Sequence, residues 1–226
     1  SENDKVKTEN GRATLVLYDS VLISLNPNTE VIINDLTKQY PKVKQTQGST
    51  WTKFADVVGV KNVDIETPDT VATVRNTEFG VEITETGTVV VVIEGTVDVT
   101  GNGKVFSVKE FNQAVVKEGA DAVLTGITPE QLAKGIENSE KILVTLKELR
   151  NKEVFEQTLL IEQAKKRADF TEEDIKQWLE DIDAGKIDDN EVIAKSPVKP
   201  PVLYKVKEMN DNIKEQQVLI ATLKNR

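Results

Sequence analysis

The chain has 226 residues, of which 29 are lysine or arginine and 38 are aspartate or glutamate, so its formal net charge is −9. A nucleic-acid-binding protein needs a basic face for the phosphates, and this charge balance argues against that class. The sequence contains neither cysteine nor histidine, which excludes disulfides, thiolate or imidazole metal ligands and a Ser-His-Asp triad. We therefore expect no enzyme activity, no cofactor and no bound metal.

The start of the chain is polar, and we expect residues 1–11 to form a flexible N-terminus. The sequence has no run of 18 apolar residues and no signal-peptide pattern. We expect membrane association only through upstream segments or through partners.

The composition changes near Gly126. Residues 57–123 hold 18 valines, whereas residues 127–226 hold seven. Because β-branched side chains suit strands and long charged side chains suit solvated helix faces, this change predicts two regions. We expect a β domain at residues 12–126 and a helical region at residues 127–194.

The β domain divides into about ten short strands with turn residues between them. Asn102-Gly103 is a strong hairpin signal, and residues 88–93 are apolar on both faces, as in a strand that is buried on both sides. This spacing predicts a sandwich, a roll or a short solenoid, and the sequence does not choose among them. The expected buried side chains are Trp51, Val74, Phe79, Val81, Val91, Ile93 and Val97.

The stretch from Val74 to Phe79, "VRNTEF", is followed by Gly87-Thr88, by alternating valines and by Glu94-Gly95. This order resembles the signature of FecR-type domains, which is Val-Arg-Gly-Thr-x-Phe, then Gly-Thr, then alternating valines and Glu-Gly-x-Val. The segments "DSVLISLNPNTEVII" and "VFSVKEFNQAVV" resemble the opening and the closing strands of that family. The resemblance covers about residues 12–124.

Three positions depart from the family pattern. Asn76 and Ser20 stand where glycine is usual, and Phe111 stands where a glycine-containing turn is common. Asparagine tolerates the left-handed backbone region, so Asn76 is expected to keep the family's conformation. Phenylalanine does so only at a cost, so the turn at Phe111 is expected to be rebuilt.

The "VRNTEF" stretch itself has two interpretations. In the structural one, Arg75 and Glu78 satisfy each other or nearby backbone groups, Thr77 caps a turn and Phe79 fills the core. In the functional one, the stretch is a loop that contacts a ligand. We favour the structural interpretation, because nothing else nearby indicates a pocket.

The helical region begins with a capping box, in which Thr128 is the N-cap and Gln131 lies at N3. A second helix start is expected at Ser139, followed by nearly thirty helical residues. Phe170 and Ile175 flank an N-cap at Thr171 as a hydrophobic staple, and the amphipathic helix that follows is expected to end at Gly185.

An acidic segment after this helix resembles a calcium loop. With Gly185 at position 6 of an EF-hand loop, the ligand positions 1, 3 and 5 hold Glu180, Ile182 and Ala184, so the register fails. We expect a helix end and a solvated turn. Calcium is kept as a weak alternative, because five oxygen ligands cluster here: Asp181, Asp183, Asp188, Asp189 and Glu191.

The chain ends with a predicted linker and helix. Residues 195–201, "KSPVKPP", form a Pro-rich linker, and residues 202–226 carry apolar side chains at heptad spacing. The stripe packs either on the long helix of the same chain or in a coiled coil with another chain. Its candidate interaction residues are Val202, Val206, Met209, Ile213, Ile220 and Leu223.

The FecR resemblance implies an extracytoplasmic protein that binds other proteins. The family's regulators combine the domain with a membrane helix, a cytoplasmic sigma-binding segment and a small α/β signalling subdomain, and residues 127–226 resemble none of these. We expect a structural or scaffold subunit of an envelope assembly, with homo-oligomerisation through the C-terminal helices. The alternative is a receiver in envelope-to-sigma-factor signalling.

Overall fold

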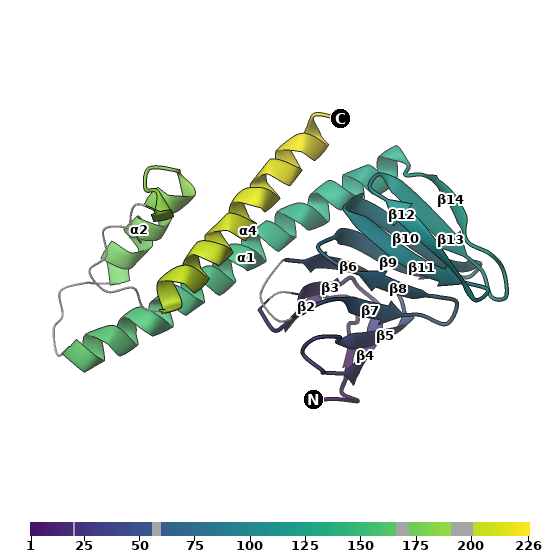
Figure 1. Cartoon of the computed structure of the whole chain (residues 1–226), viewed down its shortest axis with the longest axis horizontal. Coiled ribbons are helices and arrows are strands. Elements are labelled where there is room, and N and C mark those ends of the chain that lie inside the picture. Colours follow the sequence, from purple (N-terminus) through teal and green to yellow (C-terminus); the bar gives the residue numbers. More distant parts are fainter. Residues whose placement is uncertain (20, 56–59, 166–171, 191–200) are drawn as a thin grey trace. The chain divides into compact units, whose positions relative to one another are not determined.

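A computed structural model describes residues 1–19, 21–55, 60–165, 172–190 and 201–226 (Figure 1). The chain divides into two compact units. Ser1–Glu140 together with Thr222–Arg226 form the first, which we call the β unit, and Lys141–Ala221 form the second, the helical unit. Each is described by itself.

The described part of the β unit contains fourteen strands, four more than the sequence pattern indicated. They are β1 (Lys5–Lys7), β2 (Ala13–Leu17), β3 (Val21–Leu25), β4 (Glu30–Asp35), β5 (Lys42–Gln47), β6 (Ser49–Phe54), β7 (Val63–Glu66), β8 (Val71–Val74), β9 (Glu78–Thr84), β10 (Gly87–Glu94), β11 (Thr96–Gly101), β12 (Lys104–Lys109), β13 (Asn112–Val116) and β14 (Val123–Gly126).

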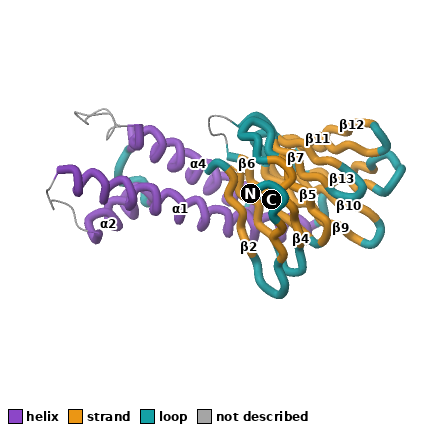
Figure 2. The backbone as a smooth tube through the Cα atoms, turned by 90° about the horizontal axis from the view of Figure 1, so that it is seen from below, coloured by secondary structure: helices purple, strands orange, loops and turns teal. Residues whose placement is uncertain are grey.

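The strands form two seven-stranded sheets. The first has the order β1-β4-β5-β7-β8-β11-β12, and the second has the order β14-β13-β10-β9-β6-β3-β2. Neighbouring strands are antiparallel, except for the parallel pair β5 and β7. The expected mainly β domain is confirmed: its strands form two sheets that share one core (Figures 1 and 2). In each sheet the strands follow the order of the chain, so the chain passes back and forth between the sheets along the domain. We call the packed pair of sheets the sandwich.

One hydrophobic core joins the two sheets. Ile65 and Val97 of the first sheet and Phe79, Val81 and Val92 of the second belong to the same buried cluster. Val92 lies opposite Phe79 in the register of β9 and β10, so inward-facing residues follow the period of two that a strand imposes. All seven side chains expected to be buried are at most 8% exposed.

The turns need left-handed backbone at non-glycine residues. Asn102 and Gly103, with φ of 51° and 72°, close the expected β11–β12 hairpin. Asn76 has φ of 47°, as the sequence predicts. Phe111 also has a positive φ, 59°, so the expectation of a rebuilt turn is wrong. The Phe111 amide donates to Val92 O at 2.8 Å, and the Arg226 guanidinium lies 3.5 Å from its ring centroid, contacts that favour this conformation.

Helix α1 (Pro129–Lys165) begins with the predicted capping box. The Gln131 amide donates to Thr128 Oγ1 at 3.2 Å, and the Thr128 amide donates to Gln131 Oε1 at 2.8 Å. The expected second start at Ser139 is wrong, because α1 continues through it and the hydroxyl of this buried serine bonds to Glu78 instead of capping a helix. Residues Pro129–Glu140 of α1 belong to the β unit and Lys141–Lys165 to the helical unit.

The helical unit also contains α2 (Glu172–Asp183) and most of α4 (Pro201–Lys224). The chain leaves α2 at Gly185, which has φ of 69°, as predicted. Phe170 and Thr171 of the predicted staple, and residues 195–200 of the predicted linker, lie outside the described residues. Within those residues, none of the helices is long and apolar enough to cross a membrane.

Candidate functional site

The outer face of the second sheet carries a layer that the sequence did not predict. Trp51 of β6 lies there, directly opposite Gly80 of β9. A Cβ atom on Gly80 would come within 2.5 Å of the Trp51 ring, and one on Gly135 of α1 would come within 3.5 Å of it. The indole therefore lies between a strand and a helix that both present glycine. Trp51 is only 5% exposed, although it lies outside the sandwich core.

Glu78 is the polar centre of this layer. Its side chain is fully buried, and Oε1 accepts a hydrogen bond from Trp51 Nε1 at 3.0 Å and another from the hydroxyl of Ser139 on α1. A buried carboxylate is tolerated when it accepts several hydrogen bonds. The "VRNTEF" stretch thus fastens the first turns of α1 to the sheet.

Arg75 and Glu78 do not pair with each other, which was the first of the two alternatives for their partners. Arg75 is exposed, because it lies in the turn between β8 and β9, whereas Glu78 begins β9 and faces α1. Two other parts of the structural interpretation are confirmed. Thr77 Oγ1 donates to Arg75 O at 2.8 Å, and Phe79 is a fully buried core residue.

A buried cation lies beside Glu78. Lys53 of β6 and Glu94 of β10 both face Glu78 in the strand register, and Lys53 forms an ion pair with Glu94. The Lys53 side chain is only 4% exposed. Three charged residues on three neighbouring strands therefore share one face of the sheet.

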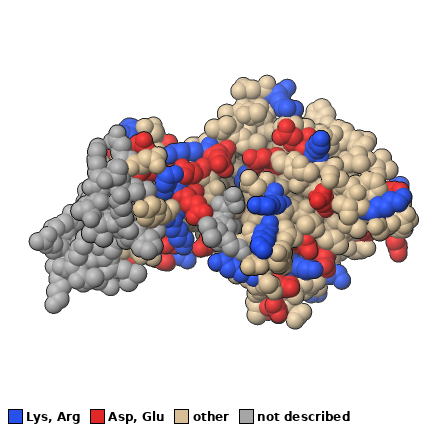
Figure 3. All heavy atoms as spheres, viewed as in Figure 1, with Lys and Arg blue, Asp and Glu red and all other residues tan. Residues whose placement is uncertain are grey.

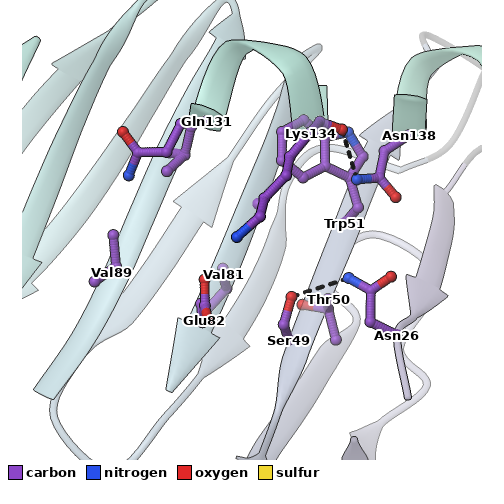
Figure 4. A pocket seen from close by; sticks show the side chains of 12 residues that line it. Asn26, Ser49, Thr50, Trp51, Val81, Glu82, Val89, Gln131, Lys134 and Asn138 are labelled. Carbon is purple, nitrogen blue, oxygen red and sulfur yellow. Dashed lines mark hydrogen bonds between the residues drawn. The ribbon is translucent and has the colours of Figure 1, made fainter. Parts of the chain in front are cut away.

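A small pocket of about 50 Å³ opens beside Trp51 (Figure 4). Asn26 and Ser49 line one side and are joined by a hydrogen bond of 3.0 Å, while Lys134 and Asn138 of α1 line the other. This volume accommodates a few waters at most. On the face of the β unit shown in Figure 3, acidic and basic side chains are mixed.

The helical unit has a buried polar centre of its own. Arg150 of α1 is 1% exposed, and its Nη1 donates to Asp183 Oδ1 at 2.7 Å and to Asn210 Oδ1 of α4 at 2.9 Å. Arg150 of α1 therefore bonds to both α2 and α4. A cavity of about 470 Å³ lies beside it, lined by α1 and α2. Partial burial raises the pKa of Asp183, but hydrogen bonds from Arg150 and Lys147 outweigh it and hold that pKa below the ordinary value.

The residues of the weak calcium alternative have other partners. Asp181 accepts from Lys186 at 2.9 Å, Asp183 accepts from Arg150, and Asp189 lies 3.4 Å from Lys214. Asp188 accepts from the Asn190 amide at 2.9 Å. Glu191 lies outside the described residues. Within the described ranges, these carboxylates form no group that could hold a metal ion.

The apolar stripe of α4 is covered within the chain. Val206, Ile213, Ile220 and Leu223 are 6, 2, 8 and 1% exposed, and Met209 is half-buried. Val202 lies in α4, but its side chain is outside the described part. An ion pair of 2.9 Å between Lys205 and Glu153 and the bond from Arg150 to Asn210 place α4 antiparallel to α1. In one chain the stripe makes an internal contact, which was one of the two alternatives.

The bonds of Glu78 and Arg150 escaped the sequence analysis because their partners lie far along the chain. Ser139 is 61 residues from Glu78, and Asn210 is 60 residues from Arg150. One signal was available for the first: Glu78 stands between Thr77 and Phe79, in a stretch where every second side chain faces the core. Glu78 and Trp51 both lie on the outer face of the second sheet. A carboxylate beside a tryptophan on that face indicates that another element of the chain covers it.

Residues 4–98 match the family described as FecR protein. The β unit contains a FecR-type domain. The match ends within β11, so β12 to β14 and all of the helices lie outside it.

Two solved structures resemble the chain. Both are crystal structures, at 1.65 and 2.50 Å resolution, of a protein from Parabacteroides distasonis ATCC 8503 described as a candidate anti-sigma factor. Each has a TM-score of 0.50 and 16% sequence identity to this chain. The likeness covers 57% of this chain and 63% of the first structure's chain, so less than two thirds of that protein is matched. At this identity the likeness shows the fold. No curated protein matches the sequence.

Proposed function

We propose that this chain is a non-enzymatic, extracytoplasmic protein-binding module of a bacterial envelope signalling system, in which the FecR-type domain receives a signal from a protein partner and relays it to a sigma-factor regulator. The observation that carries the proposal is the FecR match at residues 4–98, which falls within one compact sandwich. The fold shared with a candidate anti-sigma factor supports it.

The construction of the β unit suits a binding module. Glu78, Trp51 and Ser139 fasten Pro129–Glu140 of α1 to the sheet, so the helix start is part of the domain. A partner that binds the sandwich therefore binds a domain that includes the first turns of α1. The same helix continues into the helical unit, which gives binding at one unit a covalent helical path to the other.

A structural subunit of an envelope assembly is the second candidate. It is favoured by the helical unit, which lies outside the FecR match and has its own buried Arg150 network. In that case the helices connect subunits, and association through the α4 stripe is part of this proposal. Because the stripe is buried within one chain, such association requires α4 to exchange between copies.

Deletion of the gene in its native bacterium separates the two candidates. Loss of a signalling module should change the transcription of a small set of genes, and the wild-type gene should restore it. Loss of a structural subunit should change envelope composition while that transcription stays constant. A gene whose upstream part encodes a membrane helix and a cytoplasmic domain would support the signalling module. No transcriptional change under any envelope stress would overturn it.

A further inference from the structure

Helix α4 passes from the helical unit into the β unit at Thr222, so its last turn belongs to the β unit. Helix α1 makes the same passage in the other direction after Glu140. The chain therefore runs from the β unit into the helical unit through α1, whereas at the α4 end the connection rests on non-covalent contacts of residues 222–226. We call residues 222–226 the clasp.

Two cations hold the clasp in the β unit. The Arg226 guanidinium lies 3.5 Å from the centroid of the Phe111 ring, and Lys224 Nζ lies 2.6 Å from Glu140 Oε1. Leu223, next to Lys224, is 1% exposed. The clasp thus combines one buried apolar side chain with two cations, and the partners of these cations stand on different elements. Phe111 lies in the turn between β12 and β13, and Glu140 lies on α1.

Phe111 is the residue at which the clasp meets the backbone of the β unit. Its amide donates to Val92 O of β10 at 2.8 Å, and its carbonyl accepts from the Ile127 amide at 3.1 Å, directly before the N-cap of α1. Its φ of 59° lies in the left-handed region, which is unfavourable for phenylalanine and persists only where surrounding contacts hold it. The stacked guanidinium of Arg226 is one of these contacts.

The contacts of the two cations are weak enough to open. The side chains of Lys224 and Glu140 are 53 and 47% exposed, and an ion pair in water contributes little. Arg226 is exposed as well, and a cation over an exposed ring changes an equilibrium constant about two- to fivefold. The core cluster between the sheets does not include Phe111 or Leu223, so the clasp can open while that core stays intact.

We propose that the clasp is a conformational switch, which holds the last turn of α4 on the turn between β12 and β13 when it is closed and releases that turn of α4 when it is open. Closing the clasp also stabilises the left-handed backbone of Phe111, because the ring and the backbone belong to one residue. By linkage, a change at either of these two places is felt at the other. A partner that binds the Phe111 ring in place of Arg226 therefore releases the end of α4.

Hydrogen exchange on the full chain measures the clasp, because a helix end that is not held frays and its amides exchange faster. Arg226→Met removes the cation and should raise the exchange rate of residues 222–226 about two- to fivefold. Lys214→Met is the matched control and should leave that rate unchanged. Lys214 is a cation on the same helix, but it lies in the helical unit, where it pairs with Asp189.

Phe111→Gly separates loss of the clasp from damage to the β unit. Glycine adopts a positive φ without steric cost, so this variant removes the ring and keeps the turn. It should raise exchange at residues 222–226 as much as Arg226→Met does. The double variant should exchange no faster than either single variant, because both substitutions break the same contact. Effects that multiply in the double variant overturn the proposal, as does an Arg226→Met rate equal to that of the wild type.

The reciprocal effect is measured at Phe111 by nuclear magnetic resonance. Arg226→Met should also speed exchange of the Phe111 amide, which donates to Val92 O. The Ile83 amide, which donates to Gly48 O at 2.9 Å, should keep its rate. An unchanged Phe111 amide contradicts the coupling, and an equal rise at both amides contradicts a local switch. Neither result depends on the signalling role proposed above, because only the chain itself is measured.

Discussion

At the scale of single residues, two glycines of the β unit allow the backbones of β9 and α1 to pack against the indole ring of Trp51. Gly80 and Gly135 leave space for Trp51, and a side chain at Gly80 would meet the rigid indole at 2.5 Å. At Gly135 the nearest atom is the flexible end of Ile93, at 2.8 Å, so that neighbour can move. The strand position is therefore the stricter requirement.

We expect Gly80→Ala to destabilise the β unit by about 1–3 kcal/mol, the usual cost of adding a methyl group to a packed interior. The indole must move, which lengthens its bond to Glu78. The measurement is urea unfolding followed by the fluorescence of Trp51 in a Trp178→Phe background. Gly11→Ala is the control, because a Cβ there meets nothing within 4 Å. Equal losses in the two variants would refute the packing argument.

Residue-scale prediction from the sequence worked where the requirement is local. The positive φ of Asn76 and the capping box at Thr128 involve neighbours in the chain, and both were predicted. Phe111 was missed because the stacked guanidinium of Arg226 is distant in sequence. A local preference worth about 1–2 kcal/mol is readily overcome by such tertiary contacts.

At the scale of elements, buried polar groups fix how α1, α2 and α4 of the helical unit meet. Arg150 bonds to Asp183 at the end of α2 and to Asn210 on α4. An arginine that is 1% exposed is costly to bury and depends on these acceptors. The stability of the unit should therefore depend on the charge of Asp183.

We expect the helical unit to lose stability in acid through Asp183. Because the folded-state pKa of this carboxyl lies below its ordinary value of 3.8, its contribution is complete above that value. The contribution is lost as the pH falls through the folded pKa. Asp183→Asn should lower stability at neutral pH and flatten its dependence on pH, measured by urea unfolding with circular dichroism. The exposed Glu148→Gln should keep the wild-type pH profile. A profile that Asp183→Asn leaves unchanged would assign acid sensitivity elsewhere.

The last helix gives a second prediction at this scale. Ile213 is 2% exposed and Val218, five residues on, is 66% exposed. Ile213→Asp should destabilise the helical unit by several kcal/mol, because a carboxylate would be buried without a partner. Val218→Asp should change stability by less than about 0.5 kcal/mol, as is usual at exposed positions. Unfolding and sedimentation are measured on both variants. An Ile213→Asp chain that is fully stable but no longer self-associates would favour an interface between copies.

At the scale of the whole chain, the sequence predicted the class of each region but not where the compact units divide. The change of composition at Gly126 marks the step from β14 to α1. The β unit nevertheless extends to Glu140. Trp51 of β6 and Val91 and Ile93 of β10 make the outer face of the second sheet apolar, and the start of α1 covers it. The pattern of apolar side chains along these strands shows that both faces of the sheet are apolar. It does not show which element of the chain covers the outer face.

Two fragments test this division. A fragment of residues 1–140 should have a free energy of unfolding roughly 3–6 kcal/mol higher than a fragment of residues 1–126. The helix start buries the equivalent of about two large apolar side chains, and each contributes about 1.5–3 kcal/mol. Trp51 is the only tryptophan in both fragments, so its fluorescence reports directly on the covering helix. Emission from the shorter fragment should be shifted to the red by contact with water. Glu137→Gln in the longer fragment is the control, because that side chain is 57% exposed and does not line the pocket beside Trp51. Should both fragments unfold at the same urea concentration with the same emission, the first turns of α1 do not cover Trp51, and the β unit ends at Gly126.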